Sequence, residues 1–245
     1  MTKLGKSVVV ILILAILGIV GFVLLKKGTP VLVPPTENVP IHTGIEISPL
    51  VTNDATTTYT EMHLSYPHSS NTEYPEIFTL VNSTRNDFID LTDSEGQAHN
   101  IQAENPYQLF ITTRIATSTK TVSYILETYE FTGGAHGNTG VSTFTYDANH
   151  KLVTIDKIFK PDYLKTISDM SRKYFLESID ADYLNKTMLN EGTTATTTNF
   201  STWYLTDKTV TFIFGQYQIG PYVLGIQEYP IDKSKIQDIL QPEFK

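Results

Sequence analysis

A short glycine-rich segment, residues 129–139, has the clearest potential in this sequence for recognition or chemistry. It contains three glycines within five positions, beginning with Gly133 and Gly134, and glycine lets the backbone take positive φ and approach another chain closely. His136 is the only large side chain among the glycines, and Asn138 follows. One interpretation is a tight connection between strands, with His136 hydrogen-bonded to a nearby carbonyl. The other is a loop that binds a partner.

A catalytic role for the same loop is a further alternative. His136 would act as a general base on cell-wall material, with the carboxylate of Asp147 or Asp156 orienting its ring. The sequence contains no G-x-S-x-G nucleophile elbow, H-E-x-x-H motif, phosphate-binding loop or dinucleotide-binding glycine motif. We therefore expect a binding protein rather than an enzyme, with no catalytic residues and no cofactor.

A second unusual segment surrounds Pro221. Proline cannot donate a hydrogen bond within a sheet, so Pro221 must lie at a bend or at a sheet edge. Tyr217 and Tyr222 flank it, and their rings either pack internally or present flat, amphipathic area to a partner. We expect this bend and the glycine-rich loop to supply the partner-binding residues, which are Gly133, Gly134, His136, Asn138, Tyr217, Pro221 and Tyr222.

Composition and charge narrow the possible partners. The 245 residues include no cysteine, and His63 and His68 lie five apart across Pro67, on neither one helix face nor one strand face, so no metal site is expected. Residues 28–245 hold 14 basic and 26 acidic residues, a net charge near −12. This acidic balance makes nucleic acid an improbable partner and would steer a cationic one toward the protein.

The N-terminus predicts a membrane anchor. Residues 7–25 carry no charge and would reach roughly 28 Å as a helix, close to the ~30 Å hydrocarbon core of a bilayer. A cleaved secretory signal is the alternative, but the run is long and no small-residue cleavage site follows it. We expect an uncleaved, single-pass helix in the cell membrane, with residues 1–6 as a cytoplasmic tail and the C-terminal body outside.

A proline-rich linker is expected between this anchor and the body. Residues 26–55 contain five of the twelve prolines of the chain, and prolines favour extended backbone without ladder hydrogen bonds. The proline content therefore predicts that this linker is a semi-rigid stalk, which would hold the body away from the membrane.

The body has the pattern of an α+β fold, a mostly antiparallel sheet with helices packed on one face. Alternating residues predict strands, Pro75 and Pro161 open helices with apolar residues three and four apart, and residues 190–198 form a Thr-rich mobile loop. The predicted strands span 60–66, 107–115, 125–131, 141–146, 151–155, 203–205, 210–214 and 222–229, and a short closing helix spans 232–240.

Several motifs resemble one extracytoplasmic module. This is the domain of unknown function shared by the lysozyme-sensing anti-sigma factor RsiV and the peptidoglycan deacetylase PdaC. The resemblance covers two consecutive halves, 56–140 and 141–240, and implies an α+β receptor-like domain outside the membrane. The matching residues are Tyr129-x-Phe131-Thr132-Gly133-Gly134-Ala135-His136-Gly137, Phe144-x-Tyr146-Asp147, Asp156-x-x-Phe159 and Tyr217-x-Ile219-x-Pro221-Tyr222-x-x-Gly225.

Three functional hypotheses follow. The first is a membrane-anchored binding domain of a bacterial envelope that recognises a cationic protein such as lysozyme, or a cell-wall glycan. The second is a cell-wall-modifying hydrolase or deacetylase accessory protein that uses His136. The third is a structural envelope component, in which the glycine-rich loop and the bend only close the fold.

Overall fold

The computed structural model describes residues 47–96 and 105–245, which all belong to one compact unit covering Ile41–Lys245. The predicted transmembrane helix at 7–25, the tail at 1–6 and the linker up to residue 46 lie outside the described residues. Within the described ranges, no helix is both long enough and apolar enough to cross a membrane.

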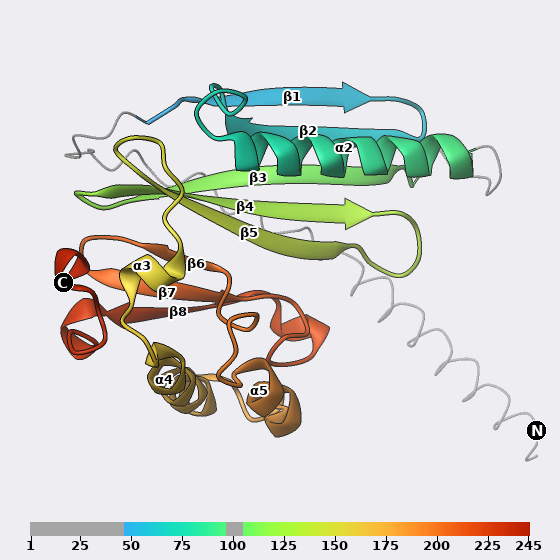
Figure 1. The fold of residues 1–245 in the computed structure, drawn as a ribbon. Helices are drawn as coiled ribbons and strands as arrows, with labels where there is room; N and C mark the ends of the chain where they lie inside the picture. Colours follow the sequence, from blue (N-terminus) through green and yellow to red (C-terminus); the bar gives the residue numbers. More distant parts are fainter. Residues whose placement is uncertain (1–46, 97–104) are drawn as a thin grey trace, which may run out of the picture. The chain divides into compact units, whose positions relative to one another are not determined.

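The first half of this unit is a five-stranded mixed sheet (Figure 1). Its strands lie side by side in chain order, and every neighbouring pair is antiparallel except the parallel pair of β2 and β3. The strands are β1 (Leu50–Thr56), β2 (Thr60–Pro67), β3 (Tyr107–Thr117), β4 (Thr121–Phe131) and β5 (Asn138–Asp147).

Helix α2 (Pro75–Gly96) makes the parallel pair possible, because parallel neighbours need a long crossover connection. It packs on one face of the sheet (Figure 1), where its buried side chains Ile77, Val81 and Phe88 meet inward-facing residues of the strands. Side chains alternate between the two faces of a strand, so the residues between these inward positions point to the opposite face. The buried strand residues of this core are Met62, Leu64, Tyr107, Leu109, Ile111, Val122, Tyr124, Leu126 and Tyr146.

The second half is a three-stranded antiparallel sheet covered by helices. Residues from its strands and helices share one hydrophobic core, which includes Phe175, Phe212 and Phe214. Its strand β6 lies against β4 and β5 of the first sheet. The elements are α3 (Ile155–Ile158), α4 (Tyr163–Ser178), α5 (Lys186–Gly192), β6 (Trp203–Leu205), β7 (Thr209–Phe214) and β8 (Gln227–Asp232), with 3-10 turns η1 (Tyr222–Leu224), η2 (Lys233–Lys235) and η3 (Pro242–Phe244).

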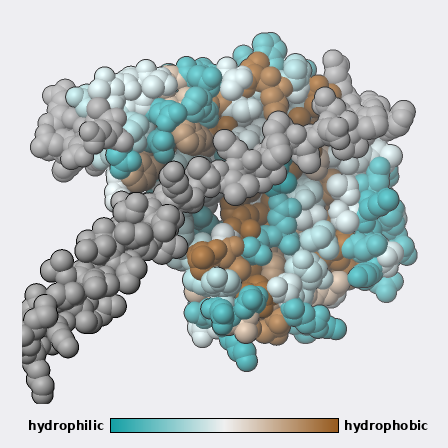
Figure 2. Space-filling model, turned by 180° about the vertical axis from the view of Figure 1, so that it is seen from behind, coloured by the Kyte–Doolittle hydropathy of each residue, from teal (hydrophilic) through white to brown (hydrophobic). Residues whose placement is uncertain are grey.

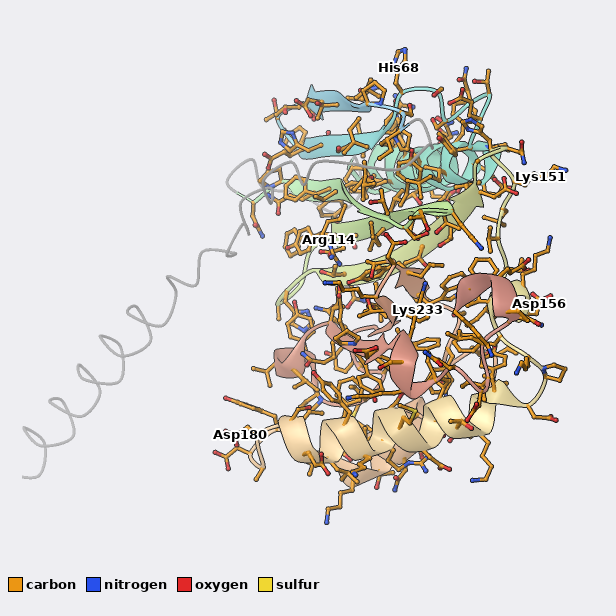
Figure 3. All side chains as sticks on the ribbon, turned by 90° about the vertical axis from the view of Figure 1, so that its left-hand side faces the viewer. His68, Arg114, Lys151, Asp156, Asp180 and Lys233 are labelled. Carbon is orange, nitrogen blue, oxygen red and sulfur yellow. The ribbon has the colours of Figure 1, made fainter. Side chains whose placement is uncertain are left out.

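Polar side chains join the two sheets. The Arg114 guanidinium of β3 donates to Glu127 at 3.1 Å and to Glu228 of β8 at 2.5 Å. Tyr204 of β6 donates to the same Glu228 at 2.8 Å, and the backbone N–H of Trp203 donates to the Thr143 hydroxyl at 3.0 Å. Figure 3 shows Arg114 between the two sheets.

The α+β class is confirmed, and several elements match their prediction, including β2, α2, the β3–β4 hairpin and β6–β7. The prediction of a single sheet is wrong, because the described residues form two sheets. The predicted linker also ends too late: residues 50–55 lie in β1, whose polar, mostly exposed residues give no alternating pattern.

Three other differences concern the second half. The expected hairpin around residue 148 has its turn but only one isolated bridge, between Tyr146 and Leu152, because the chain enters helix α3 at Ile155. The predicted loop at 190–198 begins inside α5, and its Thr side chains bond to local backbone carbonyls. The last strand is shifted to β8, and the expected closing helix at 232–240 is only the short turn η2.

His63 links the edge strand β1 to β2. Its Nδ1 lies 3.0 Å from Asp54 and its Nε2 lies 3.2 Å from Glu61. The hydrogen bond with Asp54 raises the pKa of His63 above its usual 6.5, and Glu61 adds to this increase against the opposing effect of burial.

A raised folded-state pKa means that this interaction stabilises the fold fully below about pH 6.5 and is lost as the pH rises through the folded-state pKa. We expect an NMR titration of His63 to give a pKa above 6.5 in the native chain and a lower value in Asp54→Asn. Asp90→Asn, which removes the same charge from the exposed side of α2, is the control. A native pKa at or below 6.5 would contradict the prediction.

Candidate functional site

The structure brings the glycine-rich loop and the Pro221 bend together. The rings of His136 and Tyr222 stack with their centroids 4.0 Å apart and their planes 25° apart. Tyr217 lies next to Tyr222, with ring centroids 5.7 Å apart. Residues far apart in the sequence thus form one surface, which we call the loop–bend surface and define as Gly133, Gly134, His136, Asn138, Tyr217, Pro221 and Tyr222.

Glycines shape the loop between β4 and β5. Gly133 and Gly134 have φ values of 95° and 92°, a region that other residues rarely adopt. Gly137 is needed for a different reason, because a Cβ there would lie 2.5 Å from the ring of Tyr129. The loop therefore requires glycine at two turn positions and at one close contact.

Gly137 is held between two tyrosines. The Tyr222 hydroxyl donates to its carbonyl oxygen at 3.0 Å, and the Tyr129 ring packs closely against it. Burial is the main cause that raises the pKa of Tyr129, followed by the nearby Tyr222, while the Gly137 N–H lowers it. His136 Nδ1 lies 3.0 Å from the same Gly137 carbonyl and must carry the proton to donate to it. The expected bond between His136 and a nearby carbonyl is present, and the ring remains exposed.

The bend is held by the side chain of Gln218. Its amide nitrogen donates to the carbonyls of Gly192 at 3.1 Å and Asn199 at 3.0 Å, and its amide oxygen accepts the Gly215 N–H at 3.0 Å. Tyr217, just before it, has a φ of 62°, which is strained for a tyrosine. The backbone of the bend is thus fixed while Tyr217 projects outward with 50% of its surface exposed.

A further hydrogen bond joins the two segments. The backbone N–H of Thr139, at the start of β5, donates to the Gln216 side chain at 2.9 Å. Sequence reasoning did not identify Gln216, since a glutamine in a loop carries no distinctive signal.

Sequence reasoning also missed a row of rings that continues from the loop–bend surface across the first sheet. Tyr129 stacks on Phe110 at 5.7 Å, and Phe110 contacts His63 at 5.3 Å. The three residues occupy neighbouring register positions of β4, β3 and β2, on the face opposite α2. Figure 2 views the side opposite α2, where hydrophobic patches alternate with hydrophilic residues in the visible described part.

A hollow of about 270 Å³ adjoins the loop, lined by Glu130, Thr132, Gly133, His136 and Asn138. The proposed carboxylate partner Asp147 is not near it. Asp147 and Asn138 lie at opposite ends of β5, so roughly 30 Å separates them at about 3.3 Å per residue. The Asp147 side chain instead accepts the backbone N–H groups of Asn149 and Lys151.

The second carboxylate, Asp156, belongs to α3, which follows the turn at the Asp147 end of β5. In the part of the chain that the structure describes, His136 forms no ion pair with a carboxylate, and no group of three metal-ligating side chains is present. The geometry therefore does not support the pairing of His136 with Asp147.

Two family models match the chain on either side of its midpoint. The model described as deacetylase PdaC matches residues 54–139, and the model described as a protein of unknown function (DUF3298) matches residues 156–234. The chain carries both of these domains. The resemblance inferred from the motifs is thereby confirmed. The structure has the predicted division at residue 140 inside strand β5.

Relatives of known sequence or structure agree with this assignment. The chain is 28% identical over 244 residues to the peptidoglycan-N-acetylmuramic acid deacetylase PdaC of Bacillus subtilis (strain 168), which covers 96% of this chain. The chain spans only 50% of the length of that relative.

Two crystal structures of DUF3298 family members share the fold of this two-domain chain. One from Bacteroides fragilis has a TM-score of 0.55 and 18% identity, covering 81% of this chain and 94% of its own. The other, from Pseudomonas aeruginosa, has a TM-score of 0.53 and 17% identity, covering 81% and 97%.

Proposed function

We propose that this chain is a binding domain of the bacterial envelope, anchored by residues 7–25 with its body outside the membrane. It recognises a cell-wall glycan or a cationic protein such as lysozyme through the loop–bend surface. The stacking of His136 on Tyr222 carries the proposal, because it joins two segments with unusual sequences into one exposed site. The relationship to a peptidoglycan deacetylase supports an envelope role.

Three properties of the surface favour binding. The rings are already fixed by Gly137 and Gln218, so they lose little conformational entropy when a partner arrives. Aromatic rings with polar edges suit both sugar rings and protein side chains. A net charge near −12 over residues 28–245 raises the association rate of a cationic partner.

Binding to immobilised peptidoglycan and to immobilised lysozyme at low salt tests the proposal. We expect Tyr222→Ala to weaken binding about tenfold or more, as for a central aromatic contact, and His136→Ala to weaken it as well. Tyr183→Ala removes an exposed tyrosine from the segment between α4 and α5 and should leave binding unchanged.

The remaining hypotheses give different outcomes in the same assays. Binding to neither material, or binding that Tyr222→Ala does not affect, would refute the surface. Lower thermal stability of both variants with no change in binding would favour a structural component. A hydrolytic or deacetylase activity that disappears in His136→Ala, with the fold intact by circular dichroism, would favour the accessory enzyme.

A further inference from the structure

A small pocket lies far from the loop–bend surface, at the opposite end of β4. It has a volume of about 90 Å³ and forms where the β3–β4 turn, the β6–β7 turn, η2 and the C-terminal residues meet. Lys120 precedes the first residue of β4, while the glycine-rich loop follows its last residue, so roughly 35 Å separates the two sites at about 3.3 Å per residue.

Lys233 is the unusual residue of this pocket. Only 9% of its surface is exposed, although lysine is almost never buried without a partner. Among the described residues its ammonium group has no hydrogen bond and no ion pair. Figure 3 shows Lys233 at the second sheet.

Two carboxylates, Asp207 and Glu243, line the pocket, but among the described residues neither forms an ion pair with this ammonium group. Burial lowers the pKa of Lys233, and the nearby Lys120 lowers it further, while Asp207 acts in the opposite direction from beyond ion-pair distance. The Asp207 carboxylate is already used by the turn, since its Oδ1 accepts the Thr119 N–H at 2.7 Å. The Lys233 side chain is largely covered while its ammonium group lines the pocket, and this positive charge without an ion-pair partner points to an anion that completes the site.

Other donors line the same pocket. The Lys120 ammonium donates to the backbone carbonyl of Glu243, which holds it at the pocket, and Lys245 contributes a third ammonium group. Thr119 adds a hydroxyl group, which donates well to phosphate and carboxylate oxygens, while the Ser118 hydroxyl is paired with Thr121. Three lysines and the two carboxylates of Asp207 and Glu243 line this pocket, so basic residues outnumber acidic ones there, in contrast to the body with its net charge near −12.

The size of the pocket limits what enters it. At about 30 Å³ per water molecule, 90 Å³ holds one compact group of a few heavy atoms. A hollow of about 270 Å³ shares Lys120, Glu243 and Phe244 with the pocket and adds Lys157, Asp147 and the apolar side chains of Leu152 and Val153. There is room beside the pocket for the remainder of a larger molecule.

We propose that this pocket is an oxyanion-binding site, in which Lys233 and Lys120 hold a phosphate or carboxylate group of a ligand whose remainder occupies the adjoining hollow. The site is independent of the loop–bend surface, and either site functions whether or not the other does.

Thermal unfolding of the full chain with inorganic phosphate tests the site, with sodium chloride at equal ionic strength as reference. A bound ligand raises the melting temperature in a saturable way. We expect this increase in the native chain and an affinity about tenfold lower in Lys233→Met, which loses a charge-assisted contact but keeps an apolar stem. Lys235→Met removes the same charge from an exposed position of the same turn and should retain the full increase.

Two larger ligands distinguish a phosphate group from a carboxylate group, and a second variant keeps the test possible if the first does not fold. Glycerol 3-phosphate and glucuronate carry the two anionic groups on larger molecules, and binding of either one that depends on Lys233 supports the proposal. If Lys233→Met does not fold, Lys120→Met takes its place and is expected to show the same loss. An equal phosphate response in the native chain, Lys233→Met and Lys120→Met would overturn the site.

Discussion

Gly192→Ala is expected to destabilise the protein by about 3 kcal/mol, the upper range for overpacking a buried position. A Cβ at this residue, the last of α5, would overlap the carbonyl oxygen of Gln218 and lie 2.7 Å from its carbonyl carbon. A backbone group cannot swing aside as a side chain can, so the whole bend must move. For a domain of this size, the melting temperature should fall by roughly 6–12 °C.

Gly215→Ala is the matched control for this change. Gly215 also lies beside Gln218, but a Cβ there meets no atom within 4 Å and its φ is not positive. We expect its effect on the free energy of unfolding to stay within about 0.5 kcal/mol. Equal melting temperatures for the two variants would show that the close approach of α5 to the bend is absent in solution.

Gln218→Ala should cost about 2–3 kcal/mol, because it leaves three backbone groups without their hydrogen-bond partners. These are the carbonyls of Gly192 and Asn199 and the N–H of Gly215. Denaturant unfolding measures the loss, and amide hydrogen exchange should show faster exchange at Gly215. Because Gln218 fixes the bend, binding through Tyr217 and Tyr222 should weaken together with stability.

Gln216→Ala is the control for this change, because it removes a contact between the bend and the glycine-rich loop but leaves the hydrogen bonds of Gln218 in place. Gln216 makes one hydrogen bond of this kind, to the N–H of Thr139, so its loss should cost only about 1 kcal/mol. If Gln216→Ala were as destabilising as Gln218→Ala, the side chain of Gln218 would not be what holds the bend.

Much of the fold is readable from the sequence where a regular pattern coincides with burial. Strand β2, helix α2 and the β3–β4 hairpin all follow from alternating or helical spacing of apolar residues. Strand β1 has no such pattern, because an edge strand with mostly exposed residues does not need alternating apolar side chains. The parallel pairing of β2 with β3 and the split into two sheets depend on long-range packing, which periodicity does not encode.

The site was predictable only in part, for a similar reason. Glycine and proline reveal constrained backbone locally, so the loop and the bend could both be identified from their sequences. That His136 stacks on Tyr222 depends on how β6–β8 pack against the first sheet, which no local pattern specifies. Phe110 and His63 were missed as neighbours of Tyr129, because register between strands decides which rings touch.

The contact of two tyrosines with one glycine has a thermodynamic consequence. The Tyr222 hydroxyl donates to the Gly137 carbonyl and the Tyr129 ring packs against the same glycine, so a displacement of the Tyr222 ring changes the environment of β4 through a single residue. Thermodynamic linkage is reciprocal. If a ligand bound at Tyr222 stabilises the ordered state of Gly137, then ordering Gly137 increases the affinity for that ligand by the same free energy. A measurement on the sheet and a measurement on the bend should therefore both report the ordering of Gly137.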